Sequence, residues 1–184
     1  PGTGTHMIDR SQIRDRLLAE RRPYNEVAAP EGAGVYAVFL SPRGLLLPIA
    51  PGAEGLLYVA TARDGQAARQ QYEMPTADSH LRQALASILR NHLGLHPAAA
   101  PSKADGFGLP YDSETLLSRW MRANLIGSAI AVEGDNFAKV EASLIAEMQP
   151  PLNLTGWENP QAGVLRKFRA TSLRLAEEAA RDAA

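Results

Sequence analysis

The fold of this chain is decided by two short segments, GVYAVFL at residues 34–40 and GLLYVA at residues 55–60. Both are rich in β-branched, aromatic and other apolar residues, which favour strands. The proline- and glycine-containing stretch between them predicts the connection of an antiparallel hairpin. Each strand carries one tyrosine, Tyr36 or Tyr58, on the face opposite its immediate neighbours, because side chains alternate along a strand.

Helical periodicity predicts the elements around this hairpin. We expect helices over residues 9–22, 78–92, 113–125, 135–148 and 162–181, and a third strand over residues 127–132, while residues 96–110 resemble a surface loop. The economical solution is an α/β fold in which a small three-stranded, mainly antiparallel sheet is flanked by helices. It would carry helical extensions at its N- and C-termini.

The expected domain organisation follows from this order of elements. Residues 31–158 would form one domain, preceded by an N-terminal helical extension over residues 8–30. Residues 159–184 would form a C-terminal helix packed on the domain, and residues 1–7 have the composition of an expression-tag remnant.

Composition excludes several classes of function. The 184 residues include no cysteine, which removes disulfides, thiolate zinc sites and cysteine nucleophiles and is compatible with a cytoplasmic location. No apolar run approaches the ~20 residues that cross a bilayer, so no membrane partner is expected. The net charge of −1 counts against a strongly basic nucleic-acid binder, although a local basic face could exist.

Glu141 is placed unusually for a glutamate. It lies four residues after Phe137 and four before Ile145, inside the apolar stripe of the predicted helix 135–148. A buried carboxylate without a partner is unfavourable by several kcal/mol. An arginine, a metal ion or partial exposure at the edge of the stripe must therefore offset its burial. For the two tyrosines, ordinary packing in the sheet is the simple alternative to a functional role.

The ordered set of these features resembles the GIY-YIG nuclease family, including its bacterial members. GVY at residues 34–36 and YVA at residues 58–60 resemble the GIY and YIG elements. YVATARDGQAARQQY, residues 58–72, resembles the stretch from the tyrosine to the helix arginine, here Arg69. EASLIAEMQPPLN, residues 141–153, resembles the closing motif. The resemblance covers residues 34–156.

The resemblance implies metal-dependent hydrolysis of phosphodiester bonds in DNA. Glu141 would bind one divalent metal, Mg²⁺ or Mn²⁺, and a single carboxylate suffices because substrate phosphate and water complete the shell of magnesium. Arg69 would clamp the phosphate. One of Tyr36 and Tyr58 would orient or deprotonate the attacking water while the other hydrogen-bonds the phosphate, and Asn153 would help to fix the site.

Three further residues are candidates for substrate binding. Tyr72, three residues after Arg69, resembles the histidine or tyrosine that many members carry near that position. The S-x-L-R start of the predicted helix 78–92 contains His80 and Arg82, which would contact DNA phosphate or belong to a solvated helix face.

Two departures from the family leave alternatives open. Ala60 replaces the glycine of YIG, and Thr61 replaces a lysine that would supply a nearby cation. The leading interpretation is a DNA endonuclease in repair, restriction or processing of unusual structures. A catalytically weakened nucleic-acid-binding module and a protein-interaction domain are the alternatives.

Overall fold

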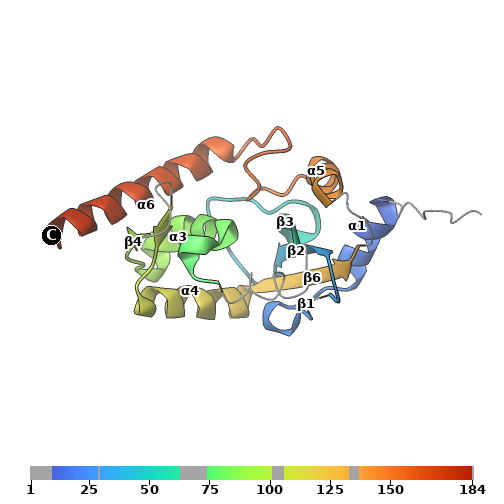
Figure 1. Ribbon diagram of the computed structural model, residues 1–184, viewed down its shortest axis with the longest axis horizontal. Coiled ribbons are helices and arrows are strands. Elements are labelled where there is room, and N and C mark those ends of the chain that lie inside the picture. The colour runs from blue at the N-terminus through green and yellow to red at the C-terminus, as the bar shows by residue number, and fades with distance from the viewer. Residues whose placement is uncertain (1–9, 29, 63–73, 101–105, 133–136, 184) are drawn as a thin grey trace, which may run out of the picture.

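The computed structural model describes residues 10–28, 30–62, 74–100, 106–132 and 137–183 (Figure 1). Its centre is the predicted hairpin. Strand β2 (Gly34–Leu40) pairs antiparallel with β3 (Leu56–Ala62), and Tyr36 lies opposite Ala60 in this register. The connection between the strands contains the short 3-10 helix η2 (Ala53–Gly55).

The remaining strands lie on the other side of β2. Strand β6 (Leu125–Ala131) pairs antiparallel with β2, and the two-residue strand β1 (Arg22–Pro23) pairs antiparallel with β6, so the order is β1-β6-β2-β3. The predicted α/β fold with a small antiparallel sheet is confirmed, with β1 as an addition. The first helix is shorter than predicted, because α1 ends at Ala19 and Arg22 is already extended. A residue before proline disfavours the helical conformation.

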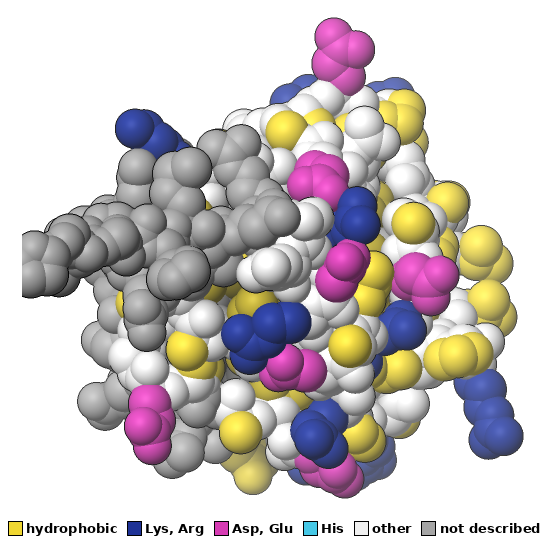
Figure 2. Space-filling model, turned by 90° about the vertical axis from the view of Figure 1, so that its right-hand side faces the viewer, with side chains coloured by type: hydrophobic (Ala, Val, Ile, Leu, Met, Phe, Trp, Pro, Cys, Tyr) yellow, Lys and Arg dark blue, Asp and Glu magenta, His cyan; other side chains and the backbone are white. Residues whose placement is uncertain are grey.

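One face of the sheet is covered by α1 (Arg10–Ala19) and α5 (Phe137–Met148). Their apolar side chains share a buried cluster with that face of β2, β3 and β6; it includes Ile13, Leu17, Val35, Phe39, Val59, Ile130, Leu144 and Ile145. An ion pair of 2.8 Å from Arg14 Nη1 to Glu147 Oε1 joins the two helices. Basic and acidic side chains are interspersed on the side of the molecule that carries these helices (Figure 2).

The opposite face carries a larger helical layer. It consists of α3 (His80–Leu93), α4 (Tyr111–Asn124) and α6 (Ala162–Asp182), with α6 lying along α3 (Figure 1). The buried cluster on this side includes Tyr24, Tyr36, Val38, Leu85, Leu117, Trp120, Met121 and Leu165. In the described residues no helix combines the length and apolarity that crossing a bilayer requires.

The described parts of the segment predicted to be a surface loop contain regular structure. Strands β4 (Ala98–Ala99) and β5 (Phe107–Gly108) pair antiparallel within it, and Phe107 is fully buried. Because Ala, Pro and Gly dominate this segment, its composition gave no sign that the Phe107 side chain would be buried in the core. The short helices η1 (Tyr24–Glu26) and η3 (Thr76–Asp78) complete the described elements.

Candidate active site

The two strand tyrosines form a pair on one face of the sheet. Their ring centroids are 6.2 Å apart with an interplanar angle of 45°. The Tyr36 side chain is buried and Tyr58 is half-buried, and a side-chain hydrogen bond joins them. Diagonal neighbours on one face of an antiparallel pair interact in this way. Both tyrosines lie on the α3 side of the sheet, and Val35, Ala37 and Val59 lie on the other side as predicted, whereas Leu57, at a register shift, shares the cluster of the tyrosines.

Glu141 approaches the sheet from α5, on the opposite side. Its half-buried carboxylate accepts a hydrogen bond of 2.5 Å from Thr61 Oγ1. Thr61 shares a sheet face with Val59 and alternates with Tyr58 along β3, so α5 meets the strand at this hydroxyl. No ion pair to Glu141 is found among the residues that the structure describes. There, a neutral donor and partial exposure offset the burial of the carboxylate.

The charge of Glu141 reaches Tyr58. The pKa of Tyr58 is raised to about 12, chiefly by burial and also by the negative charge of Glu141, while the hydrogen bond with Tyr36 acts in the opposite direction. The phenol of Tyr58 is therefore protonated at neutral pH. Tyr36, Tyr58 and Glu141 thus form one electrostatic unit that straddles β3, with the tyrosines on one side and the carboxylate on the other.

Asn153 holds the edge of the strand that carries Tyr58. Its amide Nδ2 donates to the backbone oxygen of Val59 at 2.8 Å, and its Oδ1 accepts from the backbone nitrogen of Val59 at 3.0 Å. The backbone nitrogen of Leu152 donates to the oxygen of Leu57 at 2.9 Å. Asn153 is buried by these contacts, so it positions β3.

A sharp turn brings Asn153 to this edge. Helix α5 ends at Met148, and Gln149 adopts a left-handed conformation with φ of 52° before the two prolines that follow it. A residue with a Cβ rarely adopts this conformation outside turns, at a cost of about 1–2 kcal/mol. This turn therefore fixes where Asn153, which bonds β3, lies relative to α5 and its Glu141 carboxylate.

Comparison with known proteins gives one match. The family model described as the GIY-YIG catalytic domain matches residues 49–174, more than half of the chain. The chain belongs to the GIY-YIG family. The match includes Tyr58, Glu141 and Asn153 and begins after Tyr36. No curated protein and no solved structure matches the chain.

Two of the predicted GIY-YIG positions can be compared directly with the family pattern. A Cβ at Gly34, the glycine of the GIY element, would lie 2.6 Å from the backbone oxygen of Ile130 and 2.6 Å from Pro30 Cγ, so only glycine fits there. Ala60 replaces the glycine of the YIG element. Its methyl group is 7% exposed and belongs to the buried cluster on the α3 side, so it fills core space.

Thr61, the second departure from the GIY-YIG pattern, has a role that the sequence interpretation missed. The sequence showed only the loss of a lysine at this position. Thr61 lies two residues after Val59, so strand alternation places both on the face that α5 covers. That spacing was the available signal that residue 61 would meet α5 and its glutamate.

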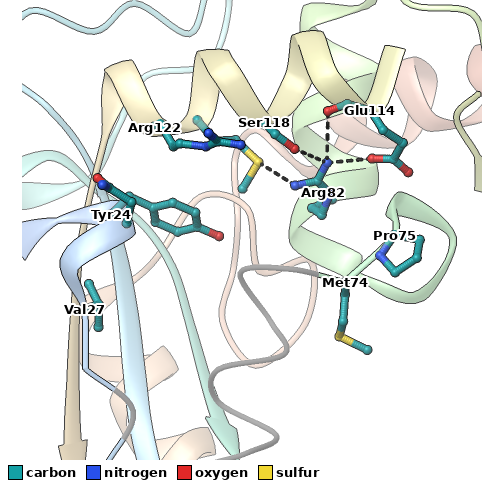
Figure 3. A pocket seen from close by; sticks show the side chains of 10 residues that line it. Tyr24, Val27, Met74, Pro75, Arg82, Glu114, Ser118 and Arg122 are labelled. Atoms are coloured by element: carbon teal, nitrogen blue, oxygen red, sulfur yellow. Dashed lines mark hydrogen bonds and ion pairs between the residues drawn. The ribbon is translucent and has the colours of Figure 1, made fainter. Parts of the chain in front are cut away.

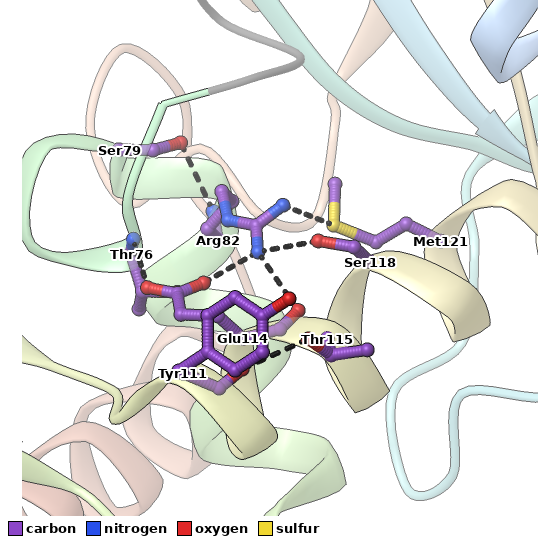
Figure 4. Close-up of polar contacts among 8 residues, drawn as sticks. All are labelled: Thr76, Ser79, Arg82, Tyr111, Glu114, Thr115, Ser118 and Met121. Atoms are coloured by element: carbon purple, nitrogen blue, oxygen red, sulfur yellow. Dashed lines mark hydrogen bonds and ion pairs between the residues drawn. The ribbon is translucent and has the colours of Figure 1, made fainter.

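Arg82 is not on a solvated helix face, and that alternative is wrong. Its side chain is 4% exposed, and its Nη2 forms an ion pair of 2.6 Å with Glu114 Oε2 and a hydrogen bond of 2.9 Å with Ser118 Oγ (Figure 4). Glu114 also accepts from the backbone nitrogen and the hydroxyl of Thr76, at 2.7 and 2.9 Å. Helix α4 packs across the start of α3 and buries the guanidinium. Arg82 lines one pocket of the molecule (Figure 3).

Of the other predicted substrate contacts, only His80 lies within the described residues. His80 is the exposed first residue of α3, directly after the N-cap Ser79. Arg69 and Tyr72 lie outside the described residues. Glu114 was missed by the sequence interpretation, because an acidic residue in the first turn of a helix is ordinary and carries no sign of its partner.

The donor set around Glu141 fits a magnesium-type cation. Such an ion is commonly held by one or two carboxylates together with water and substrate phosphate. Within the described ranges no group of three or more His, Asp or Glu side chains could form a cage. The half-buried carboxylate of Glu141, with no cation beside it in these ranges, offers the single charged ligand that such a site needs.

Proposed function

We propose that this GIY-YIG protein is a metal-dependent endonuclease that hydrolyses phosphodiester bonds in DNA, acting in the cytoplasm. The observation that carries the proposal is the half-buried Glu141 carboxylate, which is held at β3 by Thr61 and whose charge raises the pKa of Tyr58 in the Tyr36–Tyr58 pair. A purely structural carboxylate at this depth would be expected to have a cation beside it. In the described part of the chain, the neutral hydroxyl of Thr61 lies beside the Glu141 carboxylate instead.

Glu141 would hold the divalent cation, Mg²⁺ or Mn²⁺, and Thr61 would fix the rotamer of its carboxylate. The bound cation would neutralise developing charge on the scissile phosphate and lower the pKa of coordinated water. Asn153 acts as a positioning residue, because its two hydrogen bonds to Val59 hold the strand segment next to Tyr58.

The two tyrosines would divide the remaining work. Tyr58, protonated at neutral pH, is suited to donate a hydrogen bond to a phosphate oxygen. Tyr36 would then orient the attacking water, and the fork of donors on Arg69 would clamp the phosphate. Loss of the Glu141 charge would move the pKa of Tyr58 toward its ordinary value. A cation bound to Glu141 would compensate that charge and lower the pKa of Tyr58 in the same way.

Electrostatics would contribute modestly to DNA affinity. The net charge is −1, and acidic side chains interrupt the basic ones on the α1 and α5 side (Figure 2). Few phosphates are then neutralised, and affinity should fall only gently with salt. Local contacts, for which Tyr72 and His80 are candidates, would position the substrate.

Cleavage assays test this function directly. The pure protein would be incubated with supercoiled plasmid, branched DNA and single strands in Mg²⁺, in Mn²⁺ and in a chelator. We expect nicking with either metal and none with the chelator, and loss of nicking in Tyr58→Phe and Tyr36→Phe. Salt-sensitive DNA binding without cleavage of any substrate would instead identify a binding module and overturn the proposal.

A further inference from the structure

A pocket of about 790 Å³ lies on the same side of the sheet as the tyrosine pair (Figure 3). It is bounded by η1, by Met74 and Pro75, and by the facing parts of α3 and α4. Tyr24, which lines it, belongs to the same buried cluster as Tyr36. Its volume falls within the range of roughly 300–1,000 Å³ that is typical of small-molecule sites.

One wall of the pocket is a buried charged group. Arg82 is held in place by Glu114 and Ser118, and its Nη1 approaches the sulfur of Met121 at 3.4 Å. Its Nε is buried and has no hydrogen-bond partner in the described part of the chain. Buried donors are normally satisfied. In the described residues this wall therefore holds a fixed cation with one donor that makes no hydrogen bond.

The other walls are apolar or aromatic, and the rim is polar. Val27 and Met74 line the pocket together with the largely buried side chains of Tyr24 and Met121, and Figure 3 shows Tyr24, Val27 and Met74 around it. Flat, polarisable rings pack well against thioether and aromatic side chains. At the rim, Asn25 and Arg122 are exposed: an amide that both donates and accepts, and a cation suited to phosphate.

We propose that this pocket receives one unstacked nucleotide of the DNA substrate. Its base would lie among Tyr24, Met74 and Met121, its polar edge would meet Asn25, and its phosphate would pair with Arg122. The inference rests on the proposed nuclease function and adds a substrate class: DNA with an unpaired or extruded nucleotide near the scissile bond. Such a nucleotide has already lost most of its stacking and pairing, so capturing it requires less free energy.

Binding without cleavage tests the pocket. Affinity in a chelator would be measured for a fully paired duplex and for the same duplex with one bulged nucleotide. We expect the bulged duplex to bind about tenfold tighter. Asn25→Trp, which fills the pocket from its rim, and Arg122→Glu should reduce this preference to less than about twofold. Equal affinity of the wild-type protein for the two duplexes would overturn the proposal.

Arg119→Glu is the matched control. Arg119 is exposed on the same helix but does not line the pocket, so its reversal should weaken binding of both duplexes equally and keep the preference. A preference lost equally in Arg119→Glu and Arg122→Glu would show diffuse charge instead of a site. Thermal melting would verify that each variant is folded.

A second measurement separates this proposal from the nuclease function. A deoxynucleoside monophosphate would be titrated while the methyl resonances of Met74 and Met121 are followed. Shifts in the wild-type protein that disappear in Asn25→Trp support the pocket even if plasmid cleavage is absent. Plasmid cleavage without such shifts and without a bulge preference would leave the nuclease proposal intact and reject the pocket.

Discussion

Glu114 and Glu141 are both half-buried carboxylates on helices, but in the part of the chain that the structure describes only Glu114 has a cation beside it. The Glu114 carboxylate accepts from Arg82 and twice from Thr76, which ties α4 to the start of α3. The Glu141 carboxylate accepts from the neutral hydroxyl of Thr61 and raises the pKa of Tyr58. The charge of Glu114 is compensated by Arg82 within the fold, whereas the charge of Glu141 acts on Tyr58.

The difference indicates what each carboxylate is for. A compensated buried pair needs nothing from outside, and removing either partner leaves an uncompensated charge. A carboxylate held only by a hydroxyl has an orientation but keeps its charge, which suits a ligand for a divalent cation. Stability should therefore depend on Glu114 and Arg82, and activity on Glu141.

Glu141→Gln gives the largest expected effect. It preserves shape and removes the charge, so metal-dependent cleavage should fall by roughly a thousandfold or more, about 4 kcal/mol of transition-state stabilisation. The melting temperature should change little. Cleavage rate and melting would be measured on one preparation, with Glu147→Gln on the exposed side of the same helix as the control. Unchanged cleavage in Glu141→Gln would remove Glu141 from the site.

Arg82→Ala should act mainly on stability. It leaves the Glu114 carboxylate without its cation, and because that carboxylate is partly exposed we expect the low end of the usual range, about 3 kcal/mol of unfolding free energy. Denaturant unfolding measures this loss. The double variant Arg82→Met with Glu114→Leu removes both charges and should recover much of it. A stable Arg82→Ala protein that had lost DNA binding would instead assign Arg82 to the substrate.

Thr61→Val should have a smaller effect on cleavage. The β-branched shape is kept and one donor to a carboxylate is lost, which corresponds to about 1.5 kcal/mol, or roughly a tenfold lower rate. Thr61→Ser keeps the hydroxyl and should retain most of the rate. A role in orienting Glu141 also predicts a higher metal concentration for half-maximal cleavage in Thr61→Val, and an unchanged metal requirement would contradict it.

The smallest expected effect concerns the titration of Tyr58. Its pKa is raised from 10.0 to about 12 in the folded protein, so the folded state binds this proton more tightly than the unfolded state. The associated stability is fully present below pH 10.0 and is lost as pH rises to about 12. Melting curves across this window should fall less steeply for Tyr58→Phe than for the wild-type protein.

The Glu141 charge can be isolated in the same titration. Ultraviolet absorbance of tyrosinate should show Tyr58 ionising at lower pH in Glu141→Gln, although above 10.0 because burial is the larger cause. An unchanged titration would mean that the charge of Glu141 does not act on Tyr58. Glu141 would then differ less from Glu114 than the structure indicates.

The sequence was sufficient for local features with a strong period. Residues 34–40 form a continuous run of β-branched, aromatic and other apolar residues, and β2 matches its predicted bounds. Glu141 was recognisable because a charge interrupted an apolar stripe. Arg82 and Glu114 could not be paired in this way, because they are 32 residues apart and each is unremarkable in its own helix.

Contacts between distant segments were also out of reach. Asn153 was singled out through the family resemblance, but its hydrogen bonds to Val59, 94 residues away, depend on the turn at Gln149. Strand β1 has two residues, too few to show alternation. Such features arise from tertiary packing, which overrides local propensity.

The strand order has a consequence for biosynthesis. Strand β6 lies between β1 and β2 in the sheet, but it begins about 100 residues after β1 ends and about 85 residues after β2 ends. A ribosome adding roughly 5–20 residues per second would release β2 and β3 several seconds before β6 can cover the open side of β2. During that interval the nascent hairpin exposes the unpaired edge of β2, a largely apolar strand, which is a template for pairing with other chains. Chaperone demand during translation should therefore peak before residue 125 emerges and decline once β6 has been inserted.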